Sequence, residues 1–383
     1  MIYEIPEIGA EEEAALERIH ELRNQLRFYL AEPRRWVGVV RRVLAARAIQ
    51  GSNSIEGFNV SVEDALAAIE GDEPAEASRE NWLAVLGYRR AMTYVLRLAE
   101  DKHFAYTPGL IRSLHFMMTE YDLDASPGLW RPGPIWVRND ATGEVVYEGP
   151  EDEAVPVLIE ELIGQLEAEA DNYHPMIRGA MAHLNLAMIH PFRDGNGRMA
   201  RCLQTLVLAR EAILASEWAS IEEYLGRNTQ RYYDVLAEIG EGRWRPEGDA
   251  RPWVQFCLEA HYVQAASVLR RVRESEAIWN AVDKLRDAAK LHDRTLPNLF
   301  DAAIGLKIRN SSYRSNVEAQ EGEEISTQVA GNDLRTLVEL GLLERRGVKR
   351  GTYYIAGKPL VEIRGQVQAN REEIDASELF ALA

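Results

Sequence analysis

Apolar residues recur at helical spacing along most of this 383-residue chain, and that spacing constrains its fold more than any other feature. Leu16, Ile19, Leu22 and Leu26, for example, lie three or four positions apart with charged residues between them. Such a stripe falls on one face of an α-helix, where it can be buried. We therefore predict a mainly helical protein, and the sequence contains no internal repeat.

One stretch clearly interrupts the helical pattern in the first half of the chain. Between Ser126 and Pro150, proline and glycine residues precede β-forming residues that flank a turn. This composition predicts a loop followed by a β-hairpin, with strands at 135–138 and 145–147 and the turn at 140–143.

The charge balance restricts the kinds of partner. Forty-four Lys plus Arg against 61 Asp plus Glu give a formal net charge of −17, which argues against a surface built for nucleic acid or anionic membrane. Cys202 and Cys257 lie in apolar helical patterns without metal-ligand spacing, so we expect buried, reduced thiols. The first 26 residues lack the basic start and apolar stretch of a signal peptide, so we expect a soluble cytoplasmic protein with no membrane partner.

Residues 190–201, HPFRDGNGRMAR, combine several groups that bind phosphate. Apolar stripes on both sides predict a loop that joins two helices, with Pro191 ending the first of them. The glycines allow the backbone to approach a ligand, and the start of the second helix offers unpaired N–H groups. Arg198 and Arg201, three positions apart, project from one side of this first turn. We predict a polyphosphate site here.

Other residues of the loop complete this chemistry. Asp194 supplies the oxygen ligand that Mg²⁺ prefers, and Asn196 can cap the helix or donate to a phosphate oxygen. His190 titrates near neutrality and can accept a proton from an attacking hydroxyl. An ordinary capped helix end would explain the arginines alone but not the whole set, which fits in-line transfer onto phosphorus. His183 shares a helix face with His190, but no further metal-ligand pattern accompanies the two.

This string resembles the active-site signature of the Fic family, HxFx[D/E]GNGRxxR. Every fixed position matches: His190, Phe192, Asp194, Gly195, Asn196, Gly197, Arg198 and Arg201. The resemblance implies a Fic-type helical bundle that transfers AMP from ATP to a Ser, Thr or Tyr hydroxyl of a target protein. It implies that His190 is the general base and that Asp194 holds Mg²⁺. The segment from Gly195 to Gly197 would receive phosphate oxygens, and the two arginines would bind the β/γ end of ATP.

The resemblance extends to the hairpin and to a later helix. The hairpin corresponds to the family's flap over the target segment, so Val145, Val146 and Tyr147 are candidate target-binding residues. A target strand could pair with its main chain. Residues 220–236 look like the family's following helix, where Asn228, Tyr232 and Tyr233 are candidates for the nucleotide pocket. Core packing is the alternative for the two tyrosines.

A second short stretch, GSNSIEGFN at 51–59, resembles the family's inhibitory motif [S/T]xxxE[G/N] through Ser52, Glu56 and Gly57. It precedes the catalytic residues, as in the N-terminally inhibited class. The resemblance implies that Glu56 pairs with Arg201 and removes the cation that should hold the γ-phosphate. In some members the same glutamate supports hydrolytic removal of AMP, and the sequence leaves that alternative open.

Near the end of the chain, a helical pattern at 327–340 precedes two β-like segments within 341–357, an order that resembles a winged helix. Gln328 and Asn332 could face a DNA groove. The predicted wing carries four cations: Arg345, Arg346, Lys349 and Arg350. A docking or structural role is favoured over DNA binding, because the acidic chain has no wide basic footprint. A DNA-binding regulator with a nucleotide-sensing core is the alternative from another functional class.

These patterns predict four regions and leave several partners open. The regions are a helical part with the inhibitory motif at 1–70, the catalytic core at 71–275, the winged helix at 276–360 and a C-terminal tail at 361–383. The target protein cannot be read from the sequence, and self-modification and a homodimer are both compatible with it.

Overall fold

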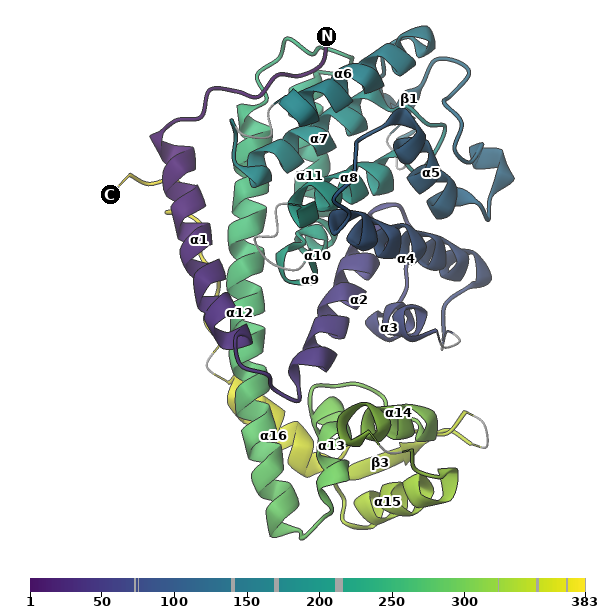
Figure 1. Ribbon diagram of the computed structural model, residues 1–383, viewed down its shortest axis with the longest axis vertical. Coiled ribbons are helices and arrows are strands. Elements are labelled where there is room, and N and C mark those ends of the chain that lie inside the picture. Colours follow the sequence, from purple (N-terminus) through teal and green to yellow (C-terminus); the bar gives the residue numbers. More distant parts are fainter. Residues whose placement is uncertain are drawn as a thin grey trace. The chain divides into compact units, whose positions relative to one another are not determined.

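The computed structural model describes residues 1–71, 74, 76–138, 142–168, 172–210, 216–322, 324–348, 351–369 and 371–382. Figure 1 shows that the chain is mainly helical, which confirms the predicted fold class. It divides into two compact units, one of Met1–Arg23, Val43–Ala265 and Asp375–Ala383, the other of Asn24–Arg42 and Ala266–Ile374. The chain passes between the units within α1 (Ala10–Leu30), α2 (Val37–Ile55) and α12 (Arg251–Ala288).

The first unit is a helical bundle built around two antiparallel neighbours, α7 (Pro175–Ile189) and α8 (Asn196–Arg210). Helix α6 (Val155–Ala168) packs on α7, and α4 (Arg79–Ala99) and α5 (Pro108–Thr119) pack on α8. Shorter helices complete the bundle: α3 (Val62–Glu70), α9 (Ser216–Ala219), α10 (Glu222–Arg227) and α11 (Thr229–Gly240). Short 3₁₀ turns lie at Leu123–Ala125 and Asp152–Ala154.

Helix α7 begins and ends where its sequence dictates. Pro175 occupies the first turn, where its fixed φ is favourable and its missing N–H costs nothing. His190 ends the helix in the left-handed region (φ 51°, ψ 56°), and Pro191 follows immediately. Almost every side chain between these ends is buried, including the polar side chains of Arg178, His183 and Asn185, as expected for a central helix that is packed on all sides.

The predicted hairpin is confirmed as β1 (Trp136–Arg138) paired with β2 (Val145–Glu148). The strands are antiparallel, with Val137 opposite Tyr147. Part of the predicted turn at 140–143, including Asp140, lies outside the described residues. Tyr147 is buried and its hydroxyl donates to the Met188 carbonyl at 2.7 Å, which holds the hairpin against the end of α7.

The core of the first unit joins both ends of the chain to the central helices. Tyr3 and Leu379 are buried in the same cluster as Trp253 of α12. Arg18 of α1 donates to the Ala381 carbonyl at 2.9 Å, so this part of the predicted tail lies along α1. Both cysteines are buried and free, as predicted.

The second unit ends in three helices, a hairpin and a last helix. These are α13 (Leu296–Ala303), α14 (Asn310–Glu321), α15 (Thr327–Glu339), β3 (Leu343–Arg346), β4 (Tyr353–Ala356) and α16 (Lys358–Gln368). The predicted helix at 327–340 and the two strands after it are therefore confirmed, and the winged helix stays a prediction. Gln328, Asn332, Arg345 and Arg346 are exposed, and Arg346 pairs with Glu344 at 2.6 Å. Lys349 and Arg350 lie outside the described residues.

No helix in the described part of the chain is both long enough and apolar enough to span a membrane.

A histidine pair links α1 to the start of α7. His174 caps α7, with its Nδ1 accepting from the Met176 N–H at 3.2 Å, and its Nε2 lies 3.0 Å from Nε2 of His20. Burial, together with His20 and Arg23, lowers the pKa of His174 from 6.5 to about 4. Between these two pKa values the unfolded chain binds a proton that the folded chain does not.

We therefore expect stability to be full above about pH 6.5 and to fall as the pH drops toward about 4. His174→Asn retains an N-cap acceptor but cannot titrate. It should reduce the difference in unfolding free energy between about pH 7.5 and about pH 5.5 by on the order of 1 kcal/mol. Urea denaturation at the two pH values measures this difference, and an unchanged difference in the variant would exclude His174 as its source.

Candidate active site

The loop between α7 and α8 is held in its conformation by hydrogen bonds from one of its own side chains. Asn196 accepts from the Phe192 N–H and donates to the Phe192 carbonyl, both at 2.9 Å. The Asn196 side chain is therefore used inside the loop, where it fixes the turn instead of pointing at a ligand. Gly195 adopts a left-handed φ of 75°, and a Cβ there would lie 3.2 Å from the Thr119 side chain. These contacts fix the backbone at the start of α8.

His115 of α5 supports this loop and was not among the residues predicted from the sequence. Its ring stacks on Phe192 at 3.7 Å between centroids, with the planes 3° apart. Its Nδ1 accepts from the Gly128 N–H, and its Nε2–H donates to the Asp194 carbonyl, both at 2.9 Å. Burial lowers the pKa of His115 to about 4, so the ring is neutral and both nitrogens are satisfied. The only sequence signal was one histidine among apolar helical neighbours, which is common in protein cores.

One ring nitrogen of His190 has no hydrogen-bond partner in the part of the chain that the structure describes. Its Nδ1–H donates to the Ala187 carbonyl at 3.1 Å, which leaves Nε2 as the unprotonated nitrogen. Its own carbonyl accepts from Nε of the buried Arg131 at 2.9 Å, so the backbone on which it sits is also fixed. Burial lowers the pKa of His190, while Glu56 opposes the shift, so the ring is neutral at pH 7 and able to accept a proton.

Arg198 is fully buried yet keeps unused hydrogen-bond donors. Its Nη1 donates to the Tyr121 hydroxyl at 3.2 Å, and the guanidinium lies 4.7 Å from the Phe58 ring centroid. Its Nη2 is 3.7 Å from Asp194, whose side chain is 54% exposed. Within the described residues, neither Nε nor Nη2 of Arg198 has a hydrogen-bond partner. A buried cation with free donors beside an accessible carboxylate fits an anion that arrives together with a metal ion.

Arg201, which follows Arg198 by three positions in α8, is held by hydrogen bonds to the inhibitory stretch. Its Nε donates to the Ser52 hydroxyl at 2.7 Å, and its Nη2 donates to the Ser52 carbonyl at 2.9 Å and to Glu56 at 2.7 Å. Burial raises the pKa of Glu56, but the positive charges of Arg201 and Arg198 outweigh it and the net shift is downward. Glu56 is therefore a carboxylate at neutral pH.

The Glu56 carboxylate lies directly on the first turn of α8. A Cβ placed on Gly197 would be 2.3 Å from Oε1 of Glu56 and 3.1 Å from Nη1 of Arg201. That Nη1 has no hydrogen-bond partner among the residues that the structure describes. Glu56 thus takes the position, at a helix N-terminus, that a phosphate oxygen would be drawn to.

Two glycines bring the inhibitory stretch this close. A Cβ on Gly51 would be 2.5 Å from the Glu222 carbonyl of α10, and one on Gly226 would be 2.6 Å from Cα of Gly51. The backbones of α2 and α10 therefore touch. Gly57, in the left-handed region at φ 82°, follows Glu56 just after the end of α2.

The three candidates for the nucleotide pocket have different surroundings. Asn228 donates to the Tyr224 carbonyl at 2.8 Å. Tyr232 is only 1% exposed and bonds to His183 at 3.0 Å, so it belongs to the core of this unit. Tyr233 is 44% exposed and donates to the Ile55 carbonyl at 3.2 Å, next to Glu56. The structure thus places Tyr232 in the core and Tyr233 against the inhibitory stretch.

The flap candidates also divide. Val145 and Val146 are 46% and 40% exposed, whereas Tyr147 is directed into the core. Only the two valines therefore present side chains that a target could touch.

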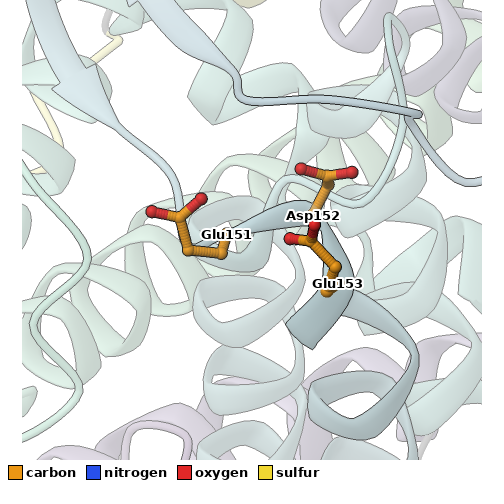
Figure 2. A group of neighbouring side chains, drawn as sticks. All are labelled: Glu151, Asp152 and Glu153. Carbon is orange, nitrogen blue, oxygen red and sulfur yellow. The ribbon is translucent and has the colours of Figure 1, made fainter.

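A group of acidic side chains lies just after β2. Glu151, Asp152 and Glu153 each have one carboxylate oxygen within 4.8 Å of those of the other two. Figure 2 shows these three side chains at the turn before α6. Exposed acidic groups of this kind are common without a metal, and Asp194, the predicted magnesium ligand, is not a member of this one. We assign no metal to it.

Known proteins resemble this chain in the region that holds the site. Residues 105–208, which include α5, the hairpin, α7, the loop and most of α8, match the model of the Fic/DOC family. This stretch of the chain is therefore similar to the Fic/DOC family.

The curated relatives are named "Protein adenylyltransferase Fic". The protein from Culex quinquefasciatus is 29% identical over 213 residues, which cover 55% of this chain and 39% of that protein. The one from Nematostella vectensis is 26% identical over 266 residues, which cover 66% of this chain and 55% of that protein. The chain thus spans about half the length of these relatives or less.

Solved structures share the fold. A Fic family protein from Desulfovibrio desulfuricans G20 has a TM-score of 0.58 at 23% identity, covering 93% of this chain and 99% of that one. A Fic domain containing signaling protein from Bacteroides thetaiotaomicron has a TM-score of 0.55 at 22% identity, covering 67% and 97%. At these identities the likeness concerns the fold.

Proposed function

We propose that this protein is a protein adenylyltransferase that moves AMP from ATP to a Ser, Thr or Tyr hydroxyl of a target protein. One observation carries the proposal: His190 offers a free ring nitrogen beside a helix N-terminus where Arg198 and Arg201 are buried with unused donors. A proton acceptor and a polyphosphate site thus occupy one loop. The activity named for the curated relatives supports the same reaction.

Each of the polar residues in this loop would have its own role in the transfer. His190 takes the proton from the target hydroxyl as its oxygen forms a bond to the α-phosphorus, and the bond from that phosphorus to the pyrophosphate oxygen breaks. Arg198 and Arg201 hold the β/γ end that leaves as pyrophosphate. Asp194 fits a magnesium ligand, because its carboxylate is half exposed and the described residues place no cation closer to it than Arg198 at 3.7 Å. The ion would neutralise phosphate charge.

We also propose that the inhibitory stretch acts as a brake. With Glu56 on Gly197 and Arg201, the γ-phosphate would meet a carboxylate where it needs a cation. ATP could then bind only in a pose that does not align its α-phosphorus with His190.

Label transfer and intact mass test the function. Wild type, Glu56→Gly and Glu56→Gly with His190→Ala are incubated with Mg²⁺ and α-labelled ATP, alone and with a cell lysate. Label in lysate proteins, or a mass gain of one AMP on the protein itself, is expected strongly in Glu56→Gly and not in the double variant. Absence of label from all three would overturn the transferase, and the same proteins would then be assayed for hydrolysis of AMP-modified proteins.

Tyr233 should contribute to the brake. Its hydroxyl holds the Ile55 carbonyl at the end of α2. Tyr233→Phe removes this hydrogen bond, so the inhibited arrangement should lose roughly 1 kcal/mol of stabilisation. The transfer rate of the otherwise wild-type protein is therefore expected to rise by about fivefold. Added to Glu56→Gly, the same change should have no effect on the rate, because the brake is already released. A further increase there would show that Tyr233 acts elsewhere.

A further inference from the structure

We propose that Tyr121, two residues after the end of α5, is a positioning residue that holds the guanidinium of Arg198 in place for the polyphosphate of ATP. The inference rests on the proposed function and deepens it, because it names a residue outside the signature loop on which polyphosphate binding depends. Its basis is the hydrogen bond from Nη1 of Arg198 to the Tyr121 hydroxyl, at 3.2 Å.

This hydrogen bond determines where the unused donors of Arg198 lie. It occupies one of the three nitrogens of a guanidinium that is 0% exposed. Nε and Nη2 have no hydrogen-bond partner in the described ranges of the chain. Nη2 lies at the signature loop, since a Cβ placed on Gly195 would be 3.5 Å from it and Oδ2 of Asp194 is 3.7 Å away. With Nη1 held, the other donors stay at the predicted phosphate site.

Tyr121 itself has a fixed place beside the loop. The next residue, Asp122, donates its N–H to the carbonyl of Thr119, the last residue of α5, at 2.9 Å. The Thr119 side chain is buried, and its Cγ2 would be 3.2 Å from a Cβ on Gly195. His115, also in α5, holds the same loop through its hydrogen bond and its stacked ring. Tyr121 therefore approaches Arg198 from a helix end that already contacts the loop.

A neutral hydroxyl suits this role better than a carboxylate. Burial raises the pKa of Tyr121, and the charge and hydrogen bond of Arg198 only partly oppose the shift, so the phenol keeps its proton at neutral pH. The oxygen can then orient the cation without neutralising its charge. A carboxylate in the same position would compete with phosphate, as Glu56 does at Arg201.

Phe58 also contacts Arg198, but it belongs to the inhibitory stretch. Its ring centroid lies 4.7 Å from the guanidinium carbon and 6.5 Å from the centroid of the Tyr121 ring. Its N–H donates to the Asn53 carbonyl of α2 at 3.0 Å, so under the proposed brake Phe58 would move together with Glu56. Tyr121 follows α5 and would stay. In the released protein it would therefore keep Arg198 oriented.

Tyr121→Phe in the Glu56→Gly background tests the inference, because phenylalanine keeps the ring and removes only the hydroxyl. Calorimetric titration with Mg-ATP is expected to show an affinity about tenfold weaker, since a hydrogen bond to a charged group is lost. AMP lacks the phosphates that Arg198 would hold, so its affinity should not change. A merely structural role would weaken the binding of both nucleotides alike.

A second variant asks whether Tyr121 acts through Arg198. Arg198→Gln in the same background removes the cation, and Arg201 remains, so Mg-ATP binding should be weaker than in the parent but still measurable. Adding Tyr121→Phe to Arg198→Gln should then cause no further loss, because the group that the hydroxyl positions is already gone. A second tenfold loss in this combination would show that Tyr121 acts elsewhere and would overturn the inference.

Tyr224→Phe in the Glu56→Gly background is the matched control. The Tyr224 hydroxyl also accepts from an arginine Nη1 at 3.2 Å, but this arginine is Arg231 of α11. The control should bind Mg-ATP and AMP as the parent does. Unchanged Mg-ATP affinity in Tyr121→Phe, or equal losses for ATP and AMP, would overturn the inference. Mg-ATP binding without transfer in the parent would overturn only the proposed function, whereas absence of binding would overturn both.

Discussion

Replacing Glu56 with glycine is expected to raise the rate of AMP transfer at limiting ATP on the order of 100-fold, which corresponds to a bias of about 3 kcal/mol. Breaking a buried ion pair usually costs roughly 3–5 kcal/mol, because one charge is left without a partner. Here the γ-phosphate would replace Glu56 as the partner of Arg201. The net free energy that favours the inhibited state should therefore lie at the lower end of that range or below it. Initial rates of label transfer from α-labelled ATP give the ratio directly.

The same substitution should change stability in a way that ATP reverses. Without Glu56, Arg201 keeps Ser52 but loses its charged partner, so the thermal midpoint of Glu56→Gly should fall below that of wild type. Mg-ATP should raise the midpoint of the variant more than that of wild type, because only the variant offers the free cation. Glu100→Gly, at an exposed helix end, is the control and should leave the rate as it is in wild type. Equal rates in Glu56→Gly and wild type would refute the brake.

How much could be read from the sequence depends on whether the interacting residues are contiguous. The loop at 190–201 could be predicted because its residues follow one another, and a loop between two apolar helices brings neighbours together whatever the rest of the fold does. His115 and Arg131 could not be found this way. They reach the loop from other elements, through the carbonyls of Asp194 and His190, and a main-chain carbonyl leaves no mark in the sequence.

Neighbouring positions in a helix or strand show a second limit. Tyr232 and Tyr233 are one residue apart on α11, so their side chains diverge by about 100°, and one faces the core while the other meets the end of α2. The sequence does not say which is which. On β2, Tyr147 points into the core, where its hydroxyl donates to the Met188 carbonyl. That partner lies 41 positions along the chain, on a helix whose approach to the hairpin depends on the whole bundle.

Replacing His190 with alanine in the Glu56→Gly background is expected to lower kcat by about a thousandfold, within the range for loss of a general base. Alanine leaves the phosphate-binding groups in place, so the affinity for Mg-ATP should remain within a few-fold of the parent's. The helix end is the structural risk, since His190 has a left-handed φ of 51° that alanine tolerates less well than histidine. His190→Asn, which tolerates this conformation and cannot act as a base, should lose activity to the same extent with an unchanged thermal midpoint.

The pH dependence distinguishes a base from a merely structural histidine. Burial lowers the pKa of His190 and the charge of Glu56 raises it, so removing Glu56 should lower it further. Activity through His190 is present above its pKa and lost as the pH falls through it, because the protonated ring cannot accept the hydroxyl proton. The acid limb of kcat against pH should therefore lie at lower pH in Glu56→Gly than in wild type and disappear in His190→Asn. Exposed His103, replaced by asparagine, should leave the profile unchanged. An acid limb that survives in His190→Asn would assign the base to another residue. Loss of both the acid limb and kcat would identify Nε2 of His190, the ring nitrogen that does not bond to the Ala187 carbonyl, as the proton acceptor.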